Sequence, residues 1–175
     1  MADDGGKIMA ESVLNGRRVL AVDDEPDVLT VLEEEILEVC PDCKFDKAVT
    51  YPEAVRKMSA HPYDLVILDI MGVRGFELLD AAVKHKFPVA MLTAHALTPE
   101  ALAQSIQMMA RVYLPKEKMG EIVPFFEYVL KYEYLPGWKL LLKKLEGFFN
   151  ERWGKGWQKT EESFWKEFNT KLLHF

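Results

Sequence analysis

The amino-acid sequence predicts an α/β fold, in which a five-stranded parallel sheet carries helices on both faces. Short apolar runs alternate with segments whose apolar residues recur at helical spacing, and this alternation continues from residue 17 to residue 131. The run at 65–68 is apolar without interruption, which is typical of a central parallel strand buried on both faces. Such an alternation builds a parallel sheet covered by helices.

Each element has its own signal in the sequence. The predicted strands are short apolar runs and lie at 17–22, 45–49 (the weakest), 65–68, 88–92 and 111–114. The predicted helices have apolar residues three or four positions apart and lie at 26–39, 52–59, 75–84, 99–109 and 122–131. Thr98 precedes Pro99 and is well placed to cap the helix that starts there.

The composition is that of a globular protein with a real core. Apolar residues make up 49% of the chain and charged residues 29%. The net charge of −6 argues against a nucleic-acid-binding role for the whole chain. No apolar run approaches the roughly 20 residues that cross a bilayer, and the acidic start of the chain lacks the order of a secretory signal. We therefore expect a cytoplasmic protein without a membrane span.

The two cysteines, Cys40 and Cys43, have the C-x-x-C spacing of a redox pair or of half a zinc site. There is no second pair, and the four histidines are scattered along the chain. The pair follows a long helix, whereas a redox pair follows a strand and opens a helix. We interpret this segment as a helix-end loop that contains two thiols.

Polar side chains stand where the predicted strands end. Asp23 and Asp24 follow the first strand, Asp69 the third, Thr93 lies at the end of the fourth, and Lys116 comes after the fifth. Taken singly, each has a structural explanation as a helix cap or a solvated side chain. Ligands of such sheets bind at the carboxyl ends of the strands, so we expect the five side chains to converge there.

The chemistry of this set is coherent. Three nearby carboxylates repel one another and favour a hard divalent cation such as Mg²⁺, which takes oxygen ligands. One carboxylate can then act as nucleophile towards a phosphoryl donor. Phosphoryl transfer mainly needs charge stabilisation and in-line positioning, which a metal and a lysine supply.

Four stretches place these residues in one order and spacing: VLAVDDEPDVL, YDLVILDIMGVRGFELL, PVAMLTAHA and ARVYLPKEKM. As a set, they resemble the receiver domain of two-component response regulators, over roughly residues 17–131. The resemblance implies a flavodoxin-like sheet with the strand order 2-1-3-4-5. It also implies Asp69 as the phosphoacceptor.

The resemblance further implies roles for the neighbouring residues. The Mg²⁺ ligands would be Asp23, Asp24, Asp69 and the backbone carbonyl of Met71. The phosphoryl-binding and switch residues would be Thr93, Ala94, Lys116 and the rotating aromatic Tyr113. The implied partner is a sensor histidine kinase or a phosphotransfer protein, and the implied protein is a signalling phosphoacceptor rather than an enzyme.

Two other functions remain open at this point. The chain could be a receiver-like interaction scaffold that is never phosphorylated. It could also resemble a haloacid-dehalogenase-like phosphatase, but that class needs a second aspartate two residues after the nucleophile, where this chain has Met71.

The sequence departs from the family's pattern in two loops. The segment 70–75 after the acceptor is about two residues shorter than usual and lacks a proline, so the rate of phosphorylation and the choice of donor are in question. The family often has Lys-Pro after the fifth strand, whereas here Pro115 precedes Lys116. If this loop contains a cis bond, Leu114-Pro115 is the favoured place.

The sequence divides into a flexible lead at 1–16, a receiver domain at 17–134 and a helical extension at 135–175. Pro136-Gly137 and the segment 154–156 indicate breaks, with a helix between them and a second helix capped at Thr160. The apolar stripe of the extension consists of Trp138, Leu142, Leu145, Phe149, Trp153, Phe164, Trp165 and Phe168.

This stripe must be covered by something. We expect a receiver to have little free apolar surface, so the stripe favours a homodimer or a helical partner. Packing of the two helices on the receiver or on each other is the alternative. Acidic residues interrupt both helices, so we expect no nucleic acid as a partner.

Overall fold

The computed structural model describes residues 12–175. Its five strands are β1 (Arg18–Val22), β2 (Lys44–Ala48), β3 (Leu65–Leu68), β4 (Val89–Thr93) and β5 (Val112–Pro115). The α-helices are α1 (Pro26–Val39), α2 (Tyr51–Ala60), α3 (Gly75–Lys84), α4 (Pro99–Gln107), α5 (Ile122–Lys131), α6 (Tyr134–Trp153) and α7 (Glu162–Leu172). Short 3₁₀ helices lie at η1 (Lys116–Glu121) and η2 (Trp157–Lys159).

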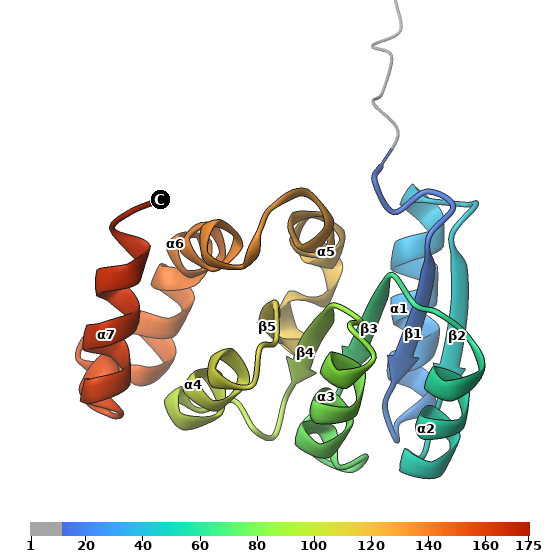
Figure 1. The fold of residues 1–175 in the computed structure, drawn as a ribbon, viewed down its shortest axis with the longest axis horizontal. Helices are drawn as coiled ribbons and strands as arrows, with labels where there is room; N and C mark the ends of the chain where they lie inside the picture. The colour runs from blue at the N-terminus through green and yellow to red at the C-terminus, as the bar shows by residue number, and fades with distance from the viewer. Residues whose placement is uncertain (1–11) are drawn as a thin grey trace, which may run out of the picture.

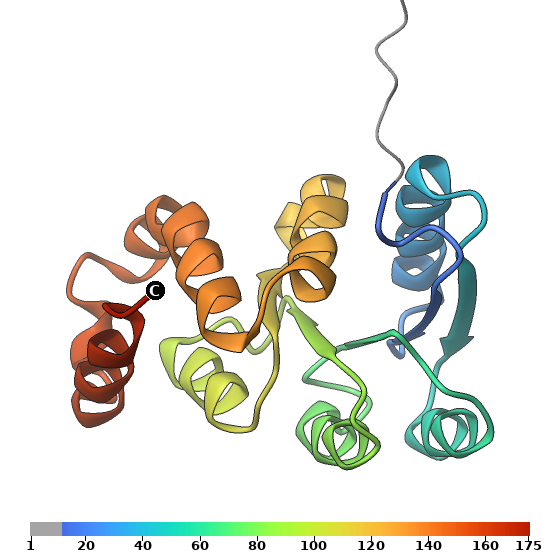
Figure 2. The ribbon, with the colours of Figure 1, turned by 45° about the horizontal axis from the view of Figure 1, so that its top comes forward.

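All strand pairs of the sheet are parallel, in the order β2-β1-β3-β4-β5. Helices α1 and α5 cover one face of the sheet, and α2, α3 and α4 cover the other (Figure 2). Every residue of β3, β4 and β5 is buried, as expected for strands covered on both faces. The predicted fold class and strand order are confirmed.

Several element boundaries agree with the sequence pattern to the residue, among them those of α1, α3 and α5. Thr98 caps α4 as predicted, because its side chain accepts the backbone N–H of Ala101 at 3.1 Å. Helix α4 ends at Gln107 rather than at 109, since Met109 adopts a positive φ of 72° that stops the helix.

The start of the C-terminal extension differs from the prediction. Helix α6 begins at Tyr134 and runs through Pro136 and Gly137, where a break was expected. Proline is tolerated in the first turn of a helix because its missing N–H would have no partner there. The second prediction to be corrected is the cap at Thr160, because α7 begins at Glu162 and is preceded by Glu161 in the left-handed conformation.

Helices α6 and α7 lie beyond the β5 edge of the sheet, beside α4 and α5 (Figure 1). In the predicted lead, residues 1–11 lie outside the described residues, whereas Leu14 is fully buried in a turn. Cys40 and Cys43 are buried free thiols in the turn after α1. Among residues 12–175 there is no cis peptide bond, and none of the helices is long and apolar enough to cross a membrane.

Candidate functional site

Three carboxylates meet at the carboxyl edge of the sheet. Strands β1 and β3 pair in parallel with Val22 opposite Leu68, so the next residues, Asp23 and Asp69, also lie side by side. Oxygen atoms of Asp23, Asp24 and Asp69 lie within 4.8 Å of one another. Asp23 is 2% exposed and Asp69 is 4% exposed, whereas Asp24 faces solvent. The sequence predicted this convergence from strand ends alone.

The ammonium of Lys116 lies over the two buried carboxylates. Its Nζ is 2.8 Å from Oδ2 of Asp23 and 3.4 Å from Oδ2 of Asp69. Burial disfavours the charged form of Lys116, but the hydrogen bond to Asp23 and the nearby carboxylate charges outweigh it and raise its pKa. One ammonium faces three carboxylates here, so the group retains negative charge when all of them are ionised.

The carboxyl of Asp69 holds its proton more tightly than usual. Burial is the largest cause and the charge of Asp23 adds to it, so the pKa of Asp69 rises from 3.8 to about 6. Lys116 and the backbone N–H of Met71 act in the opposite direction. Burial also raises the pKa of Asp23. Oδ1 of Asp69 is buried and has no hydrogen-bond partner among the described residues.

These features fit a hard divalent cation. The unpartnered oxygen of Asp69 and the excess negative charge both require compensation, and carboxylate oxygens are the ligands that Mg²⁺ takes. Gly72 keeps the approach to the group open: at its φ of 87°, a Cβ atom would lie 2.5 Å from a carboxylate oxygen of Asp24. The role of the Met71 carbonyl stays a prediction.

The short loop after Asp69 depends on a second glycine. A Cβ atom at Gly75 would lie 2.1 Å from the backbone oxygen of Asp69, so only glycine allows α3 to start this close to Asp69. Arg74 precedes it in the left-handed conformation, with its guanidinium 4.2 Å from the ring centre of Tyr51. The sequence showed that the loop was short but not how it closes.

Thr93 and Tyr113, the predicted switch residues, bind the same segment of chain. Thr93 is fully buried, and its Oγ1 accepts the N–H of Ala96 at 3.0 Å. The Tyr113 hydroxyl donates to the carbonyl of Ala96 at 2.7 Å and accepts the N–H of Thr98 at 3.2 Å. Burial raises the pKa of the Tyr113 phenol. Ala94, the residue after Thr93, is exposed.

The sequence interpretation overlooked one charged neighbour. Glu25 was not among the residues singled out from the sequence, yet its carboxylate lies 3.7 Å from Nζ of Lys116. Its backbone N–H donates to Oδ1 of Asp23 at 2.9 Å. The signal was its position directly after the acid pair, which brings it to the same edge of the sheet.

The apolar stripe of the extension is covered within the chain itself. Five of its members are buried, namely Trp138, Leu145, Phe149, Trp165 and Phe168. The other three, Leu142, Trp153 and Phe164, are partly buried and pack against the core. The premise that a receiver offers little free apolar surface was therefore wrong, because α6 packs beside α4 and α5 at the β5 edge.

Comparisons with known proteins point to one family. A family model described as the response regulator receiver domain matches residues 19–124. The two-component response regulator ARR18 of Arabidopsis thaliana is 40% identical over 88 residues, which cover 46% of this chain and 13% of that protein. The regulator ORR21 of Oryza sativa is 30% identical over 128 residues, covering 68% and 18%. The chain thus spans less than a fifth of the length of these relatives.

Solved structures show the same fold. A CheY-like receiver domain protein from Methanospirillum hungatei superimposes with a TM-score of 0.55 at 22% identity, covering 66% of this chain and 97% of that one. A response regulator from Thermotoga maritima gives a TM-score of 0.60 at 17% identity, covering 66% and 98%.

Proposed function

The chain belongs to the response-regulator receiver family of two-component signalling, and from this premise we propose that Asp69 accepts a phosphoryl group from a histidine kinase or a phosphotransfer protein. The observation that carries the proposal is the environment of its carboxylate. Asp69 is buried, has one unpartnered oxygen, and faces two further carboxylates and one ammonium. A merely structural aspartate would have its oxygens paired.

In the proposed step, an oxygen of the ionised Asp69 attacks the phosphorus atom. The bond from phosphorus to the donor nitrogen breaks, and the donor imidazole leaves with the electron pair and takes a proton from water. The products are an acyl phosphate, free histidine and the hydroxide left from water, which buffer neutralises. Mg²⁺, held by Asp23, Asp24 and Asp69, would supply charge neutralisation for the phosphoryl oxygens.

The residues of this chain have separate tasks in that step. Asp69 must be ionised to attack, which its pKa of about 6 permits at neutral pH. The ammonium of Lys116 can move from the carboxylates to bind a phosphoryl oxygen, because its Nζ already lies 3.4 Å from Asp69. The Thr93 hydroxyl can donate to another phosphoryl oxygen, which would draw it away from Ala96. We propose that this movement is the signal, so that the chain acts as a switch rather than as an enzyme.

Incubation with acetyl phosphate and Mg²⁺ tests the proposal. The intact mass of the chain should rise by one phosphoryl group, and Asp69→Asn should abolish the gain. Asp80→Asn on α3 is the matched control, because Asp80 is exposed and paired with Lys84. Excess chelator should also prevent labelling, since the unneutralised carboxylates would repel the incoming phosphate.

Two outcomes would reject the assignment. Labelling that persists in Asp69→Asn would place the acceptor elsewhere. A wild-type chain that gains no phosphoryl group would instead favour the interaction scaffold, the second candidate, for which the altered loop at 70–75 is the supporting feature.

A further inference from the structure

Three side chains of α6 donate hydrogen bonds to backbone carbonyls of the receiver and fasten the helix to it. The hydroxyl of Tyr134 donates to the carbonyl of Ile106 at 2.5 Å, and Nε1 of Trp138 donates to the carbonyl of Ala110 at 2.9 Å. These two bonds lie at the start of α6. The third lies at its last residue, where Nε1 of Trp153 donates to the carbonyl of Leu97 at 3.2 Å.

The third bond reaches the segment that the proposed switch residues hold. Leu97 lies between Ala96 and Thr98. The N–H of Ala96 binds Thr93, and the carbonyl of Ala96 binds Tyr113. The N–H of Thr98 also binds Tyr113. Any movement of Thr93 or Tyr113 that changes this segment therefore changes the position of the Leu97 carbonyl, which accepts the hydrogen bond from Trp153.

Aromatic rings make a second connection from the switch to the extension. The ring centre of Tyr113 lies 6.4 Å from that of Phe149, which stacks on Trp153 at 4.6 Å and lies 5.6 Å from Trp157. Trp157 in turn lies 5.0 Å from Trp165 on α7. The rings thus form one packed path from β5 to α7.

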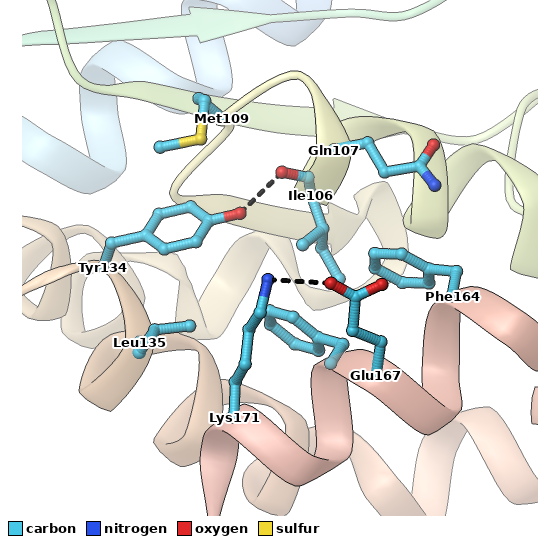
Figure 3. A pocket seen from close by; sticks show the side chains of 9 residues that line it. Ile106, Gln107, Met109, Tyr134, Leu135, Phe164, Glu167 and Lys171 are labelled. Carbon is cyan, nitrogen blue, oxygen red and sulfur yellow. Dashed lines mark hydrogen bonds and ion pairs between the residues drawn. The ribbon is translucent and has the colours of Figure 1, made fainter. Parts of the chain in front are cut away.

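Helix α7 itself has a weak hold on the receiver. Where it faces α4, a cavity of about 420 Å³ opens between Ile106, Met109, Tyr134 and Phe164 (Figure 3). Atoms that line an open cavity lack packing partners on one side, so this part of the contact between α7 and the receiver contributes little attraction. The position of α7 therefore depends mainly on the aromatic contact of Trp165 with Trp157 in η2 and on packing against α6.

Gly147 divides α6 between its two anchored ends. A glycine inside a helix weakens it, and nothing lies within 4 Å of the place where its Cβ would be. The segment after Gly147 carries Phe149 and Trp153, whereas the segment before it carries Trp138 and Leu145. The second segment can thus shift while the first stays packed.

We propose that the end of α6, together with α7, is the built-in readout of Asp69. The inference rests on the proposed phosphorylation. When Thr93 turns to the phosphoryl group, it releases Ala96, the segment 96–98 relaxes, and the contacts of Trp153 and Phe149 weaken. The end of α6 and α7 then move off the receiver, while Trp138 keeps the start of α6 in place. By linkage, weakening the Trp153 contact favours the phosphorylated state.

Hydrogen–deuterium exchange of the full chain, with Mg²⁺ and with or without acetyl phosphate, tests this inference. Intact mass of the same samples reports the phosphoryl content. Phosphorylation should speed amide exchange over residues 149–172 about five-fold or more, the equivalent of one lost hydrogen bond. Exchange over residues 134–141 should stay the same.

Two tryptophan variants distinguish the contact between the extension and the receiver from contacts within the extension. Trp153→Phe keeps an aromatic ring but removes the donor to Leu97, so exchange at 149–172 should already be about five-fold faster without acetyl phosphate, and the further response should shrink. Trp157→Phe is the matched control, because its Nε1 donates to Asn150 within the extension. This control should keep the full response to acetyl phosphate.

The outcomes distinguish the two proposals. A chain that gains a phosphoryl group without faster exchange at 149–172 would overturn the readout and leave the phosphoacceptor role standing. A chain that gains no phosphoryl group would overturn both. Equal behaviour of Trp153→Phe and Trp157→Phe, or a matching rise at 134–141, would show that the bond to Leu97 does not control the extension.

Discussion

Replacing Asp69 by asparagine should stabilise the metal-free protein, although it removes the proposed acceptor. The carboxyl of Asp69 has a pKa of about 6, against an ordinary value of 3.8. This difference means that ionising Asp69 in the folded state is about 3 kcal/mol less favourable than ionising it in the unfolded chain. Because Asp69 is only 4% exposed, solvent screening does little to reduce this figure.

The direction of the stability change follows from the pKa values of Asp69 in the unfolded chain and in the folded protein. Between about pH 4 and pH 6 the unfolded chain loses this proton before the folded protein does, so the contribution of Asp69 to the free energy of unfolding falls as the pH rises. Below that window the carboxyl is neutral in both states and the penalty is absent. Asparagine imitates the neutral carboxyl at every pH, so the variant should be more stable by up to about 3 kcal/mol at neutral pH and by little at about pH 4.

Urea denaturation in chelator, followed across this pH range, measures the effect. Asp80→Asn serves again as the control and should track the wild type, because Asp80 is an exposed residue of α3. Added Mg²⁺ should stabilise the wild type more than Asp69→Asn, since the variant lacks one anionic ligand. An asparagine variant that is less stable than the wild type at neutral pH, or that shows the same pH slope, would refute this account of the site.

Two further predictions concern the extension. Gly147→Ala should raise the free energy of unfolding by about 0.5–1 kcal/mol, because the site is helical and open. Gly154→Ala should lower the free energy of unfolding, because Gly154 has a φ of 83°. Urea denaturation that ranks the two variants the other way would contradict the helix assignment. The intact chain should sediment as a monomer at micromolar concentration, because the stripe that called for a second copy is buried within one chain. A dimer would restore the expectation drawn from the sequence.

The sequence predicted the sheet, and the convergence of the strand-end carboxylates with Lys116, because both depend on local pattern. An uninterrupted apolar run marks a central parallel strand, and the residue that ends each run must lie at the carboxyl edge. Asp23, Asp69, Thr93 and Lys116 could therefore be placed without knowing any contact. Glu25 was missed because a carboxylate at the start of a helix already has an ordinary explanation as a cap.

The extension was harder to predict because periodicity shows which side chains must be covered, but not what covers them. The stripe containing Trp138 and Phe149 required an apolar neighbour, and the sequence argument looked for it in a second copy. The neighbour is the β5 edge of the same chain, where Tyr113 contacts Phe149. Pro136-Gly137 misled for a related reason: the pair breaks a helix interior but is tolerated in a first turn.

Two loops of the site reach the last turn of α6, and they differ in what they can transmit. After β5, Lys116 is followed by Glu117, which forms an ion pair with Arg152. Both partners of this ion pair are about half exposed, so the pair contributes little to holding α6 on the receiver. After β4, the segment that Thr93 holds offers the Leu97 carbonyl to Trp153, whose ring stacks on the buried Phe149. A change in that second contact alters packing as well as hydrogen bonding. Coupling between Asp69 and the extension should therefore run through Thr93 and Trp153 rather than through Glu117 and Arg152.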